Sequence, residues 1–303
     1  MDKLLLDRIN LNEFTAILQQ TLHTNVASIT NITPLEQGMT NNSFIFTYQN
    51  KRYIMRVPGK GTAALLSRED EYENYQAIAG KHLGEHVLYL NPDNGYKLSV
   101  YIENARNCDP YNWHDVHQCM QKLRYFHQLK LTVNHSFDLY QHIEHYEKLW
   151  QQPSRYADYQ QTKQHIYALR DFIEQQPREW VLTHIDANYD NFLFTPHKLY
   201  LIDWEYAGMQ DPDVDIAMFA IYAGYDHQEI DHLIDDYYDN NCPLAKRIKI
   251  YCYVATGGLL WSNWCEYKRE AGIDFDNYDL QQYQYAQTYY QIAKQLIEEH
   301  YGK

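Results

Sequence analysis

The secondary-structure pattern of the sequence changes near residue 104, and this change constrains the fold more than any other feature. Before residue 104, short runs of β-branched and aromatic residues predict five strands, at residues 25–29, 43–48, 52–57, 86–90 and 97–102. One segment without Gly or Pro, residues 63–78, carries apolar residues at helical spacing and predicts a helix. The first part of the chain therefore resembles a small sheet with a single helix.

After residue 104 the apolar residues recur at helical spacing over much longer stretches. They predict helices at residues 113–129, 141–150, 160–174, 228–238, 245–267 and 280–299. The exception is the segment 181–206, whose three short apolar runs predict a strand, a polar loop and a hairpin, at residues 180–183, 192–194 and 199–202. We expect an α+β fold with two lobes, an N-terminal antiparallel sheet with one helix over residues 1–103 and a larger, mainly helical lobe over residues 104–303.

Charge and composition exclude several classes of protein. The chain has 26 Lys and Arg residues against 40 Asp and Glu residues, a formal net charge of −14, which argues against nucleic-acid binding. Its five cysteines include no C-x-x-C pair, so neither a disulfide framework nor a zinc ribbon is indicated. No apolar run approaches the roughly 20 residues of a membrane span, and the N-terminal run is too short for a signal peptide. We expect a cytoplasmic protein with no membrane or nucleic-acid partner.

The polar loop of the segment 181–206 carries the residues that indicate chemistry. His184, Asp186 and Asn191 form the pattern H-x-D-x-x-x-x-N, and Asp203 follows at the end of the predicted hairpin. Phosphoryl transfer from a nucleotide needs a carboxylate that orients the attacking hydroxyl, and oxygen ligands that hold Mg²⁺ against the phosphates. A single Asp or Asn would indicate only a turn. Here the spacing of His184, Asp186 and Asn191, the apolar runs on either side and the position of Asp203 all agree. Together they predict the catalytic and metal loops of a protein-kinase-like enzyme.

From about residue 37 to residue 267, the sequence resembles the choline/ethanolamine kinases, and among them the bacterial LicA-type choline kinases. The segments that carry the resemblance are GMTNN at 38–42, YIMRVPG at 53–59, REDEYEN at 68–74, HIDANYDN at 184–191, IDWEYA at 202–207, DP at 211–212 with DIA at 215–217, and WSNW at 261–264. The resemblance implies an ATP- and Mg²⁺-dependent kinase that transfers a phosphoryl group to the hydroxyl of choline and releases phosphocholine and ADP. It also implies that ATP binds between two lobes.

The resemblance implies roles for the residues of the polar loop. Asp186 would be the base toward the alcohol, and Asn191 and Asp203 would bind Mg²⁺. Glu205 is close enough in sequence to join that metal site.

Residues of the N-terminal part would hold the nucleotide. Arg56 stands where protein kinases use a lysine to hold the α- and β-phosphates, although residue type alone allows a solvated surface cation. Its charge would be fixed by a glutamate of the following helix, and spacing favours Glu71 over Glu69 and Glu73.

Two further segments would contact ATP. Gly38, Thr40 and Asn41 lie in a loop that would cover the phosphates through backbone N–H groups, although the same residues also suit an ordinary β-turn. Tyr101 and Ile102 resemble the hinge between the lobes, whose backbone would hydrogen-bond to adenine.

Two residues near the loop are expected to be structural. Asp215 resembles the buried aspartate that accepts hydrogen bonds from the catalytic-loop backbone. His184 would brace the same loop and take no part in proton transfer.

Choice of substrate depends on aromatic residues. Trp261 and Trp264 share one face of a predicted helix, and the matching Trp-x-x-Trp of the resembled family lines the choline pocket. A quaternary ammonium cannot donate a hydrogen bond and is recognised by aromatic faces. Helical periodicity alone would make both tryptophans core residues. Tyr206, Tyr222 and Tyr225 could supply further aromatic rings around the quaternary ammonium.

Two alternatives remain open from the sequence, and a zinc site is not indicated. Ethanolamine or another amino alcohol, or an aminoglycoside, could replace choline, although a primary ammonium would prefer carboxylate partners. A catalytically silent binding protein is disfavoured by the intact Asp186, Asn191 and Asp203. Pairs such as His114 and His117 lack the spacing of a zinc site.

Overall fold

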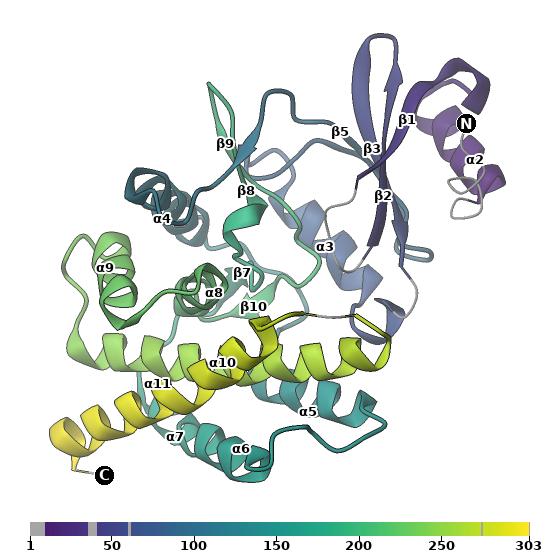
Figure 1. The fold of residues 1–303 in the computed structure, drawn as a ribbon. Helices are drawn as coiled ribbons and strands as arrows, with labels where there is room; N and C mark the ends of the chain where they lie inside the picture. The colour runs from purple at the N-terminus through teal and green to yellow at the C-terminus, as the bar shows by residue number, and fades with distance from the viewer. Residues whose placement is uncertain (1–9, 36–40, 60–61, 274, 303) are drawn as a thin grey trace. The chain divides into compact units, whose positions relative to one another are not determined.

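The computed structural model describes residues 10–35, 41–59, 62–273 and 275–302 (Figure 1). The chain forms two compact units, one made of Met1–Arg106 and Leu193–Glu205, the other of Asn107–Phe192 and Tyr206–Lys303. The predicted boundary at 103–104 lies close to residues 106 and 107, where the chain first passes from one unit to the other. The prediction of two continuous lobes needs correction, because residues 193–205 return to the first unit. There the N–H of Leu201 donates to the carbonyl of Leu83.

The first unit is built on a five-stranded antiparallel sheet. Its strands lie in the order β1(Thr30–Leu35), β2(Asn41–Tyr48), β3(Lys51–Pro58), β5(Lys97–Val100) and β4(Val87–Leu90). Strands β2 and β3 are joined by Gln49 and Asn50, with φ angles of 48° and 59°. Two successive residues with positive φ match the right-handed twist of a hairpin, so this turn fixes the register of β2 against β3.

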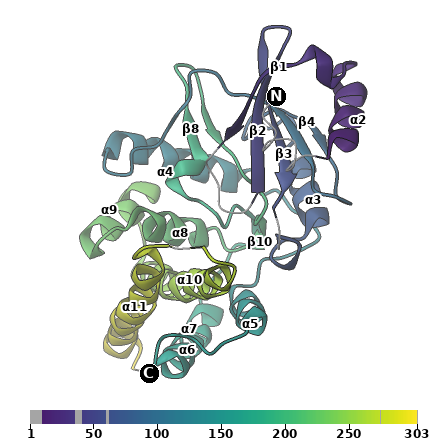
Figure 2. The same cartoon turned by 45° about the vertical axis from the view of Figure 1, so that its right-hand side comes forward.

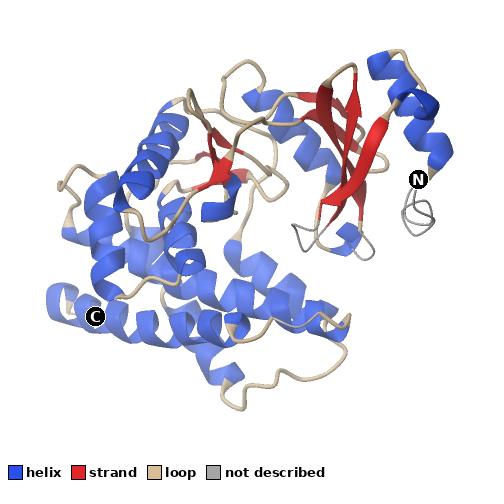
Figure 3. Cartoon of the chain, turned by 45° about the horizontal axis from the view of Figure 1, so that its top comes forward, coloured by secondary structure: helices blue, strands red, loops and turns tan. Residues whose placement is uncertain are grey.

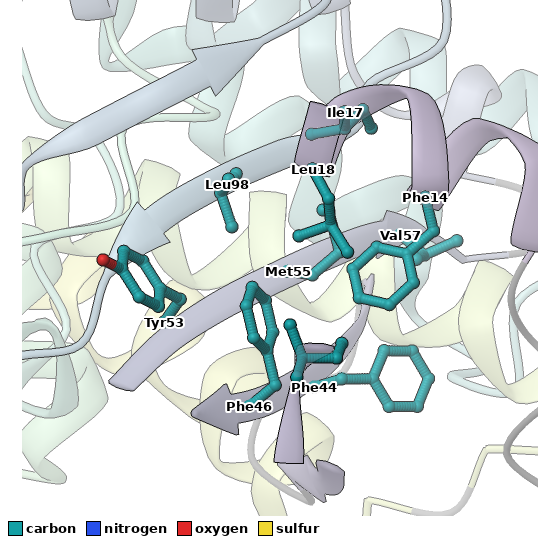
Figure 4. Close-up of a cluster of buried hydrophobic side chains, with 10 residues drawn as sticks. Phe14, Ile17, Leu18, Phe44, Phe46, Tyr53, Met55, Val57 and Leu98 are labelled. Carbon is teal, nitrogen blue, oxygen red and sulfur yellow. The ribbon is translucent and has the colours of Figure 1, made fainter. Parts of the chain in front are cut away.

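One face of this sheet is covered by helix α2(Leu11–Leu22), which the sequence analysis did not predict. The side chains of this apolar core come from α2, from three strands and from Ile29 just before β1, and the labelled ones are Phe14, Ile17, Leu18, Phe44, Phe46, Tyr53, Met55, Val57 and Leu98 (Figure 4). Alternate residues of a strand point to opposite faces. Met55 and Val57 therefore face α2, and Arg56 faces helix α3(Arg68–Ile78) on the other side.

Two predicted elements of the first unit need correction, one strand that does not form and one helix that begins later than predicted. Residues 25–29 do not form a strand, because the Asn25 side chain accepts the N–H of Ala27 and starts the 3-10 turn η1(Val26–Ser28). The predicted helix 63–78 is divided into η2(Thr62–Ala64) and α3. Ser67 caps α3 by accepting the N–H of Asp70, so the α-helix begins only at Arg68.

The strands predicted around the polar loop are confirmed. They are β7(Val181–Thr183), β8(Phe192–Phe194) and β9(Leu199–Leu201), shown in red in Figure 3. Strand β7 pairs antiparallel with β10(Gly208–Gln210), which was not predicted, and a second small sheet has the order β6(Arg106–Asn107), β8, β9. The polar loop between β7 and β8 ends in the 3-10 turn η3(Tyr189–Asn191).

The second unit is mainly helical. Its helices are α4(Trp113–Gln128), α5(Leu139–Leu149), α6(Tyr159–Ala168), α7(Arg170–Gln175), α8(Asp213–Ala223), α9(His227–Tyr237), α10(Leu244–Glu270) and α11(Tyr278–Tyr301). The predicted helix 160–174 is interrupted at Leu169, whose N–H bonds to the carbonyl of Ile166. Helix α8 was missed because nearly all of it is buried, so it lacks the amphipathic period on which the prediction relied. Within the described ranges, no helix combines the length and apolar character of a bilayer span.

Helix α10 is the central helix of this unit, and it lies against α5, α8 and α11 (Figure 2). Two adjacent glycines allow its neighbours to approach. A Cβ atom on Gly257 would meet the side chains of Met218 and Ile221 of α8, at 3.1 and 3.2 Å. A Cβ atom on Gly258 would lie 2.5 Å from the backbone oxygen of Gln282 in α11. A side chain at position 258 would therefore overlap the backbone of α11, which cannot move aside as a side chain can.

We predict that Gly258→Ala lowers the free energy of unfolding by about 1–3 kcal/mol, because the new methyl group overlaps backbone atoms of α11. Gly257→Ala is the matched control, since it makes the same change in helix propensity but meets flexible side-chain ends. Its effect should be clearly smaller. Urea unfolding of both variants tests the prediction, and equal losses of stability would contradict it.

Candidate active site

Arg56 and Glu71 form a buried ion pair in the first unit. Nη2 of Arg56 lies 2.8 Å from Oε2 of Glu71 and 3.0 Å from the carbonyl oxygen of Gly95. Burial disfavours both charges, but the attraction between them outweighs it, so the pKa of Arg56 is raised and that of Glu71 is lowered. The Arg56 side chain is only 5% exposed, which excludes the surface-cation alternative. Among the three glutamates considered, Glu71 makes this contact, as the spacing predicted.

Arg68 joins the same cluster and was missed by the sequence analysis. Its guanidinium lies 3.1 Å from Oε2 of Glu71 and 3.4 Å from Oε2 of Glu205, and it donates to Oδ1 of Asn41 at 3.0 Å. Arg68 precedes Glu71 by three residues, so the two share one face of α3. The contacts with Asn41 and Glu205 link residues that are far apart in sequence, and no local pattern could have indicated them.

Glu205 is held by this arginine cluster. Its Oε2 accepts a hydrogen bond from Nδ2 of Asn41 at 2.9 Å and lies 3.5 Å from Nη1 of Arg56. Burial, together with the negative charge of Asp203, raises the pKa of Glu205 to about 7, although Arg56 and Arg68 act in the opposite direction. The carboxylate predicted to bind a metal is thus placed among cations and an amide.

Asp203 follows strand β9 in a left-handed backbone conformation, with a φ angle of 67°. Such a conformation is uncommon for a residue other than glycine and is often found at functional sites. The next residue, Trp204, is fully buried, and its carbonyl accepts a hydrogen bond from Nδ2 of Asn74 at 3.1 Å. These contacts anchor the segment while leaving Asp203 partly exposed.

The other predicted nucleotide contacts are placed only in part. Gly38 and Thr40 lie outside the described residues. Tyr101 and Ile102 directly follow β5 and are partly buried, and the N–H of Tyr101 donates to the carbonyl of Arg52 at 3.0 Å. The guanidinium of Arg52 lies 4.0 Å from the centre of the Tyr101 ring.

In the second unit, Asp215 holds the polar loop as predicted. Its carboxylate accepts the N–H groups of His184 and Ile185, at 2.9 and 2.7 Å. His127 contacts the same carboxylate at 2.9 Å, and the hydroxyl of Tyr237 lies 2.7 Å from the other ring nitrogen of His127. Ile185 has a φ of 68°, an unfavourable conformation for a β-branched residue, so these bonds hold a strained turn. His184 is fully buried beside it.

The carboxylate of Asp186 is approached by two donors. Nδ2 of Asn191 donates to Oδ2 of Asp186 at 3.1 Å and to its backbone carbonyl at 2.9 Å. The hydroxyl of Tyr222, on α8, donates to Oδ1. The amide nitrogen of Asn191 is thereby directed at Asp186. The amide oxygen of Asn191 is then the atom suited to bind a metal ion.

Four aromatic rings form a cluster in the second unit, and one of them, that of Tyr222, belongs to the side chain that contacts this carboxylate. Trp261 is central, with its ring centre 5.4 Å from that of Tyr206, 5.7 Å from that of Tyr222 and 6.2 Å from that of Trp264. Nε1 of Trp264 donates to the Tyr206 hydroxyl at 3.1 Å. The prediction that the two tryptophans share a helix face is confirmed, and the hydrogen bond from Tyr222 connects this aromatic cluster to Asp186.

The predicted fifth ring has other contacts. Tyr225 is buried, its ring lies 5.4 Å from that of Trp113, and its hydroxyl donates to the carbonyl of Pro110. Tyr278, at the start of α11, was missed by the sequence analysis. Burial and the nearby negative charge of Asp186 contribute to raising its pKa well above the usual value. Nothing in the sequence around Tyr278 distinguishes it from the many other tyrosines of the chain.

The comparison with protein families decides how these two groups of residues are interpreted. The family model of the choline/ethanolamine kinases matches residues 32–255. The chain belongs to this family. The match includes Arg56, Glu71, Asp186, Asn191 and Asp203 but ends before Trp261.

Individual proteins named LicA are similar over most of the chain. Protein LicA of Haemophilus influenzae is 26% identical over 256 residues, which cover 80% of this chain and 75% of the relative. The crystal structure of the choline kinase LicA from Streptococcus pneumoniae has a TM-score of 0.82 and 27% identity, covering 93% of this chain and 98% of that one. A structure of LicA in complex with AMP has a TM-score of 0.80 and 26% identity, with the same coverage.

We predict that Glu71→Ala lowers the free energy of unfolding by about 3 kcal/mol, because it leaves the buried Arg56 without its main partner. Glu69→Ala removes an exposed glutamate from the same helix turn and is the control, with an expected change below about 0.5 kcal/mol. Urea unfolding measures both. A loss in Glu71→Ala no larger than in the control would show that the pair contributes little to stability.

Proposed function

We propose that the protein is a choline kinase, which transfers the γ-phosphoryl group of ATP to the hydroxyl of choline and releases phosphocholine and ADP. Membership of the choline/ethanolamine kinase family and the similarity to LicA proteins support the reaction class. The observation that carries the choice of acceptor is the contact chain within the second unit from Asp186 through Tyr222 to Trp261. It places a group that can accept a hydroxyl proton beside aromatic rings that can bind a quaternary ammonium.

Asp186 would act on the acceptor hydroxyl. Its carboxylate would orient the choline oxygen and take up the hydroxyl proton as that oxygen forms a bond to the γ-phosphorus. The bond from the γ-phosphorus to the β,γ-bridging oxygen breaks at the same time, and ADP leaves with the electron pair. Asn191 contributes by holding Asp186, since its amide nitrogen donates to both the carboxylate and the backbone of that residue.

Arg56 would hold the nucleotide. It is fixed by Glu71 and carries a permanent positive charge, which suits contact with phosphates. The solved LicA complex with AMP supports the use of an adenine nucleotide, which Tyr101 and Ile102 would bind. Because the proposed reaction consumes ATP, which is available inside cells, we propose a cytoplasmic location.

Asp203 and Asn191 would hold Mg²⁺. They offer a carboxylate and an amide oxygen, and Mg²⁺ binds such oxygen ligands in small number while retaining water and phosphate oxygens. When bound, Mg²⁺ would offset the charge of the phosphates. Within the described ranges, no three His, Cys, Asp or Glu side chains are grouped so as to hold a metal. We assign Glu205 to supporting Arg56 and Arg68, on the contacts it makes.

The aromatic cluster would bind the trimethylammonium group. A cation over an aromatic face gains about 0.5–2 kcal/mol, most of all over Trp. The cluster already shows this interaction, because the ammonium of Lys268 lies 5.3 Å from the centre of the Trp264 ring. Trp261 would present its ring to choline, with Tyr206 and Tyr222 on either side.

The proposed function is tested by measuring ADP release from Mg·ATP with choline, ethanolamine, an aminoglycoside, thiamine or no acceptor. We expect turnover that is strongly selective for choline. Turnover with another acceptor alone would retain the kinase chemistry and contradict the choice of substrate. No turnover above the acceptor-free rate, in a preparation that binds Mg·ATP by calorimetry, would contradict the choline kinase assignment.

We predict that Asp186→Asn lowers kcat for choline by about 10²–10⁴-fold, because the amide keeps the shape of the side chain but cannot take up the proton. The midpoint of thermal unfolding should stay close to that of the wild type. Steady-state kinetics and a thermal scan measure the two quantities. A variant with wild-type kcat would contradict the assignment of the base.

We predict that Trp261→Leu raises KM for choline by about tenfold and leaves KM for ATP unchanged, because the variant loses an aromatic face but keeps an apolar side chain. The control substrate is 3,3-dimethylbutanol, the uncharged analogue of choline. Its KM should change much less than that of choline. Equal changes for both acceptors would indicate that the indole fills space without binding the cation.

A further inference from the structure

Tyr222 connects two parts of the proposed acceptor site. Its hydroxyl donates to Oδ1 of Asp186, and its ring centre lies 5.7 Å from that of Trp261, with the ring planes inclined at 44°. The group that acts on the acceptor hydroxyl and the ring that faces the acceptor cation are therefore linked through one side chain.

The link is rigid at both ends. Tyr222 lies on α8, whose neighbouring residues from Asp213 to Ile221 are all buried, and Phe219 packs against Phe192 at a ring separation of 5.8 Å. At the other end, the second carboxylate oxygen of Asp186 accepts the amide of Asn191. With a different donor on each oxygen, the carboxylate cannot rotate without losing one hydrogen bond.

The Tyr222 hydroxyl is suited to remain a donor. Burial and the charge of Asp186 raise its pKa well above the usual value. The hydroxyl therefore stays protonated, and able to donate, at neutral pH. A phenylalanine here would keep the ring beside Trp261 but lose the bond to Asp186.

We infer that Tyr222 is a positioning residue that holds the Asp186 carboxylate at a fixed distance from the Trp261 ring, and so selects acceptors by the length of chain between hydroxyl and quaternary nitrogen. The inference rests on the proposed function. In choline two carbons separate these groups. An acceptor with one more carbon would place its hydroxyl out of line with the carboxylate when its cation lies against Trp261.

The test compares Tyr222→Phe with the wild type on choline and on its three-carbon homologue, (3-hydroxypropyl)trimethylammonium. We expect kcat for choline to fall about tenfold, with KM for choline within about twofold of the wild type, because the ring that faces the cation is retained. We expect the kcat/KM preference for choline over the homologue to fall by a similar factor. A role in folding alone would not change this preference.

Tyr283→Phe is the matched control. The Tyr283 hydroxyl donates to Oδ1 of Asp158 at 2.9 Å, so this variant also removes a hydrogen bond from a buried tyrosine to an aspartate. Its kcat and its preference for choline should equal those of the wild type. Tyr222→His restores a donor on a ring, and it should recover part of the lost kcat even if Tyr222→Phe is too unstable to assay.

The outcomes separate this inference from the proposed function. A wild-type enzyme that does not phosphorylate choline refutes the proposed function. With an active wild type, an unchanged kcat in Tyr222→Phe overturns the inference. An increase in KM at constant kcat, or equal losses on both acceptors, also overturns it, because each would reduce Tyr222 to a wall of the pocket. Failure of Tyr222→His to exceed Tyr222→Phe, or to show activity where Tyr222→Phe cannot be assayed, would likewise contradict the role of the hydrogen bond.

Discussion

The geometry of the proposed acceptor site depends on the hydrogen bonds that the buried carboxylate of Asp215 accepts. It accepts two successive backbone N–H groups, those of His184 and Ile185, and so stabilises a left-handed β-branched residue immediately before Asp186. A strained backbone of this kind costs about 1–3 kcal/mol and persists only where its surroundings hold it. The contacts of Asp215 with His127, and of His127 with Tyr237, extend that support into α4 and α9. The position of Asp186 is therefore set by residues that have no direct part in the proposed reaction.

The first unit uses charge in a different way. Arg56 and Arg68 face Glu71 and Glu205 in a buried cluster with equal numbers of positive and negative groups, and Asn41 contacts both Arg68 and Glu205. Such a cluster gives little net stability, since the cost of removing four charges from water offsets most of their attraction. The cluster instead fixes the orientation of its side chains. Arg56 is held by a bidentate carboxylate, which keeps its guanidinium in one plane.

The sequence was informative where the deciding residues are close together in the chain. The loop from His184 to Asn191 was recognised by spacing within eight residues, and Glu71 was chosen over its neighbours by its place on one helix. Contacts between distant segments were not accessible, so Arg68, which contacts Asn41 and Glu205, was missed. The prediction of helices and strands failed where the usual sequence signal was absent or misleading. Helix α8 is buried on all sides and shows no amphipathic period, and Asn25 starts a turn within residues that otherwise favour a strand.

The paired glycines of α10 bear on how the specificity of such an enzyme can evolve. The side chain of Met218 would be met by a Cβ atom on Gly257, and its sulfur also lies 3.1 Å from Nε1 of Trp261, one helical turn further along α10. A single added methyl group at position 257 would displace the flexible end of Met218, which contacts the ring of Trp261. Trp261 and its neighbour Tyr222 belong to the proposed acceptor site, so the shape of that site can be altered by a residue that lies outside it. Side-chain packing behind the proposed site is thus a route by which a new acceptor could be acquired while every residue of that site is retained.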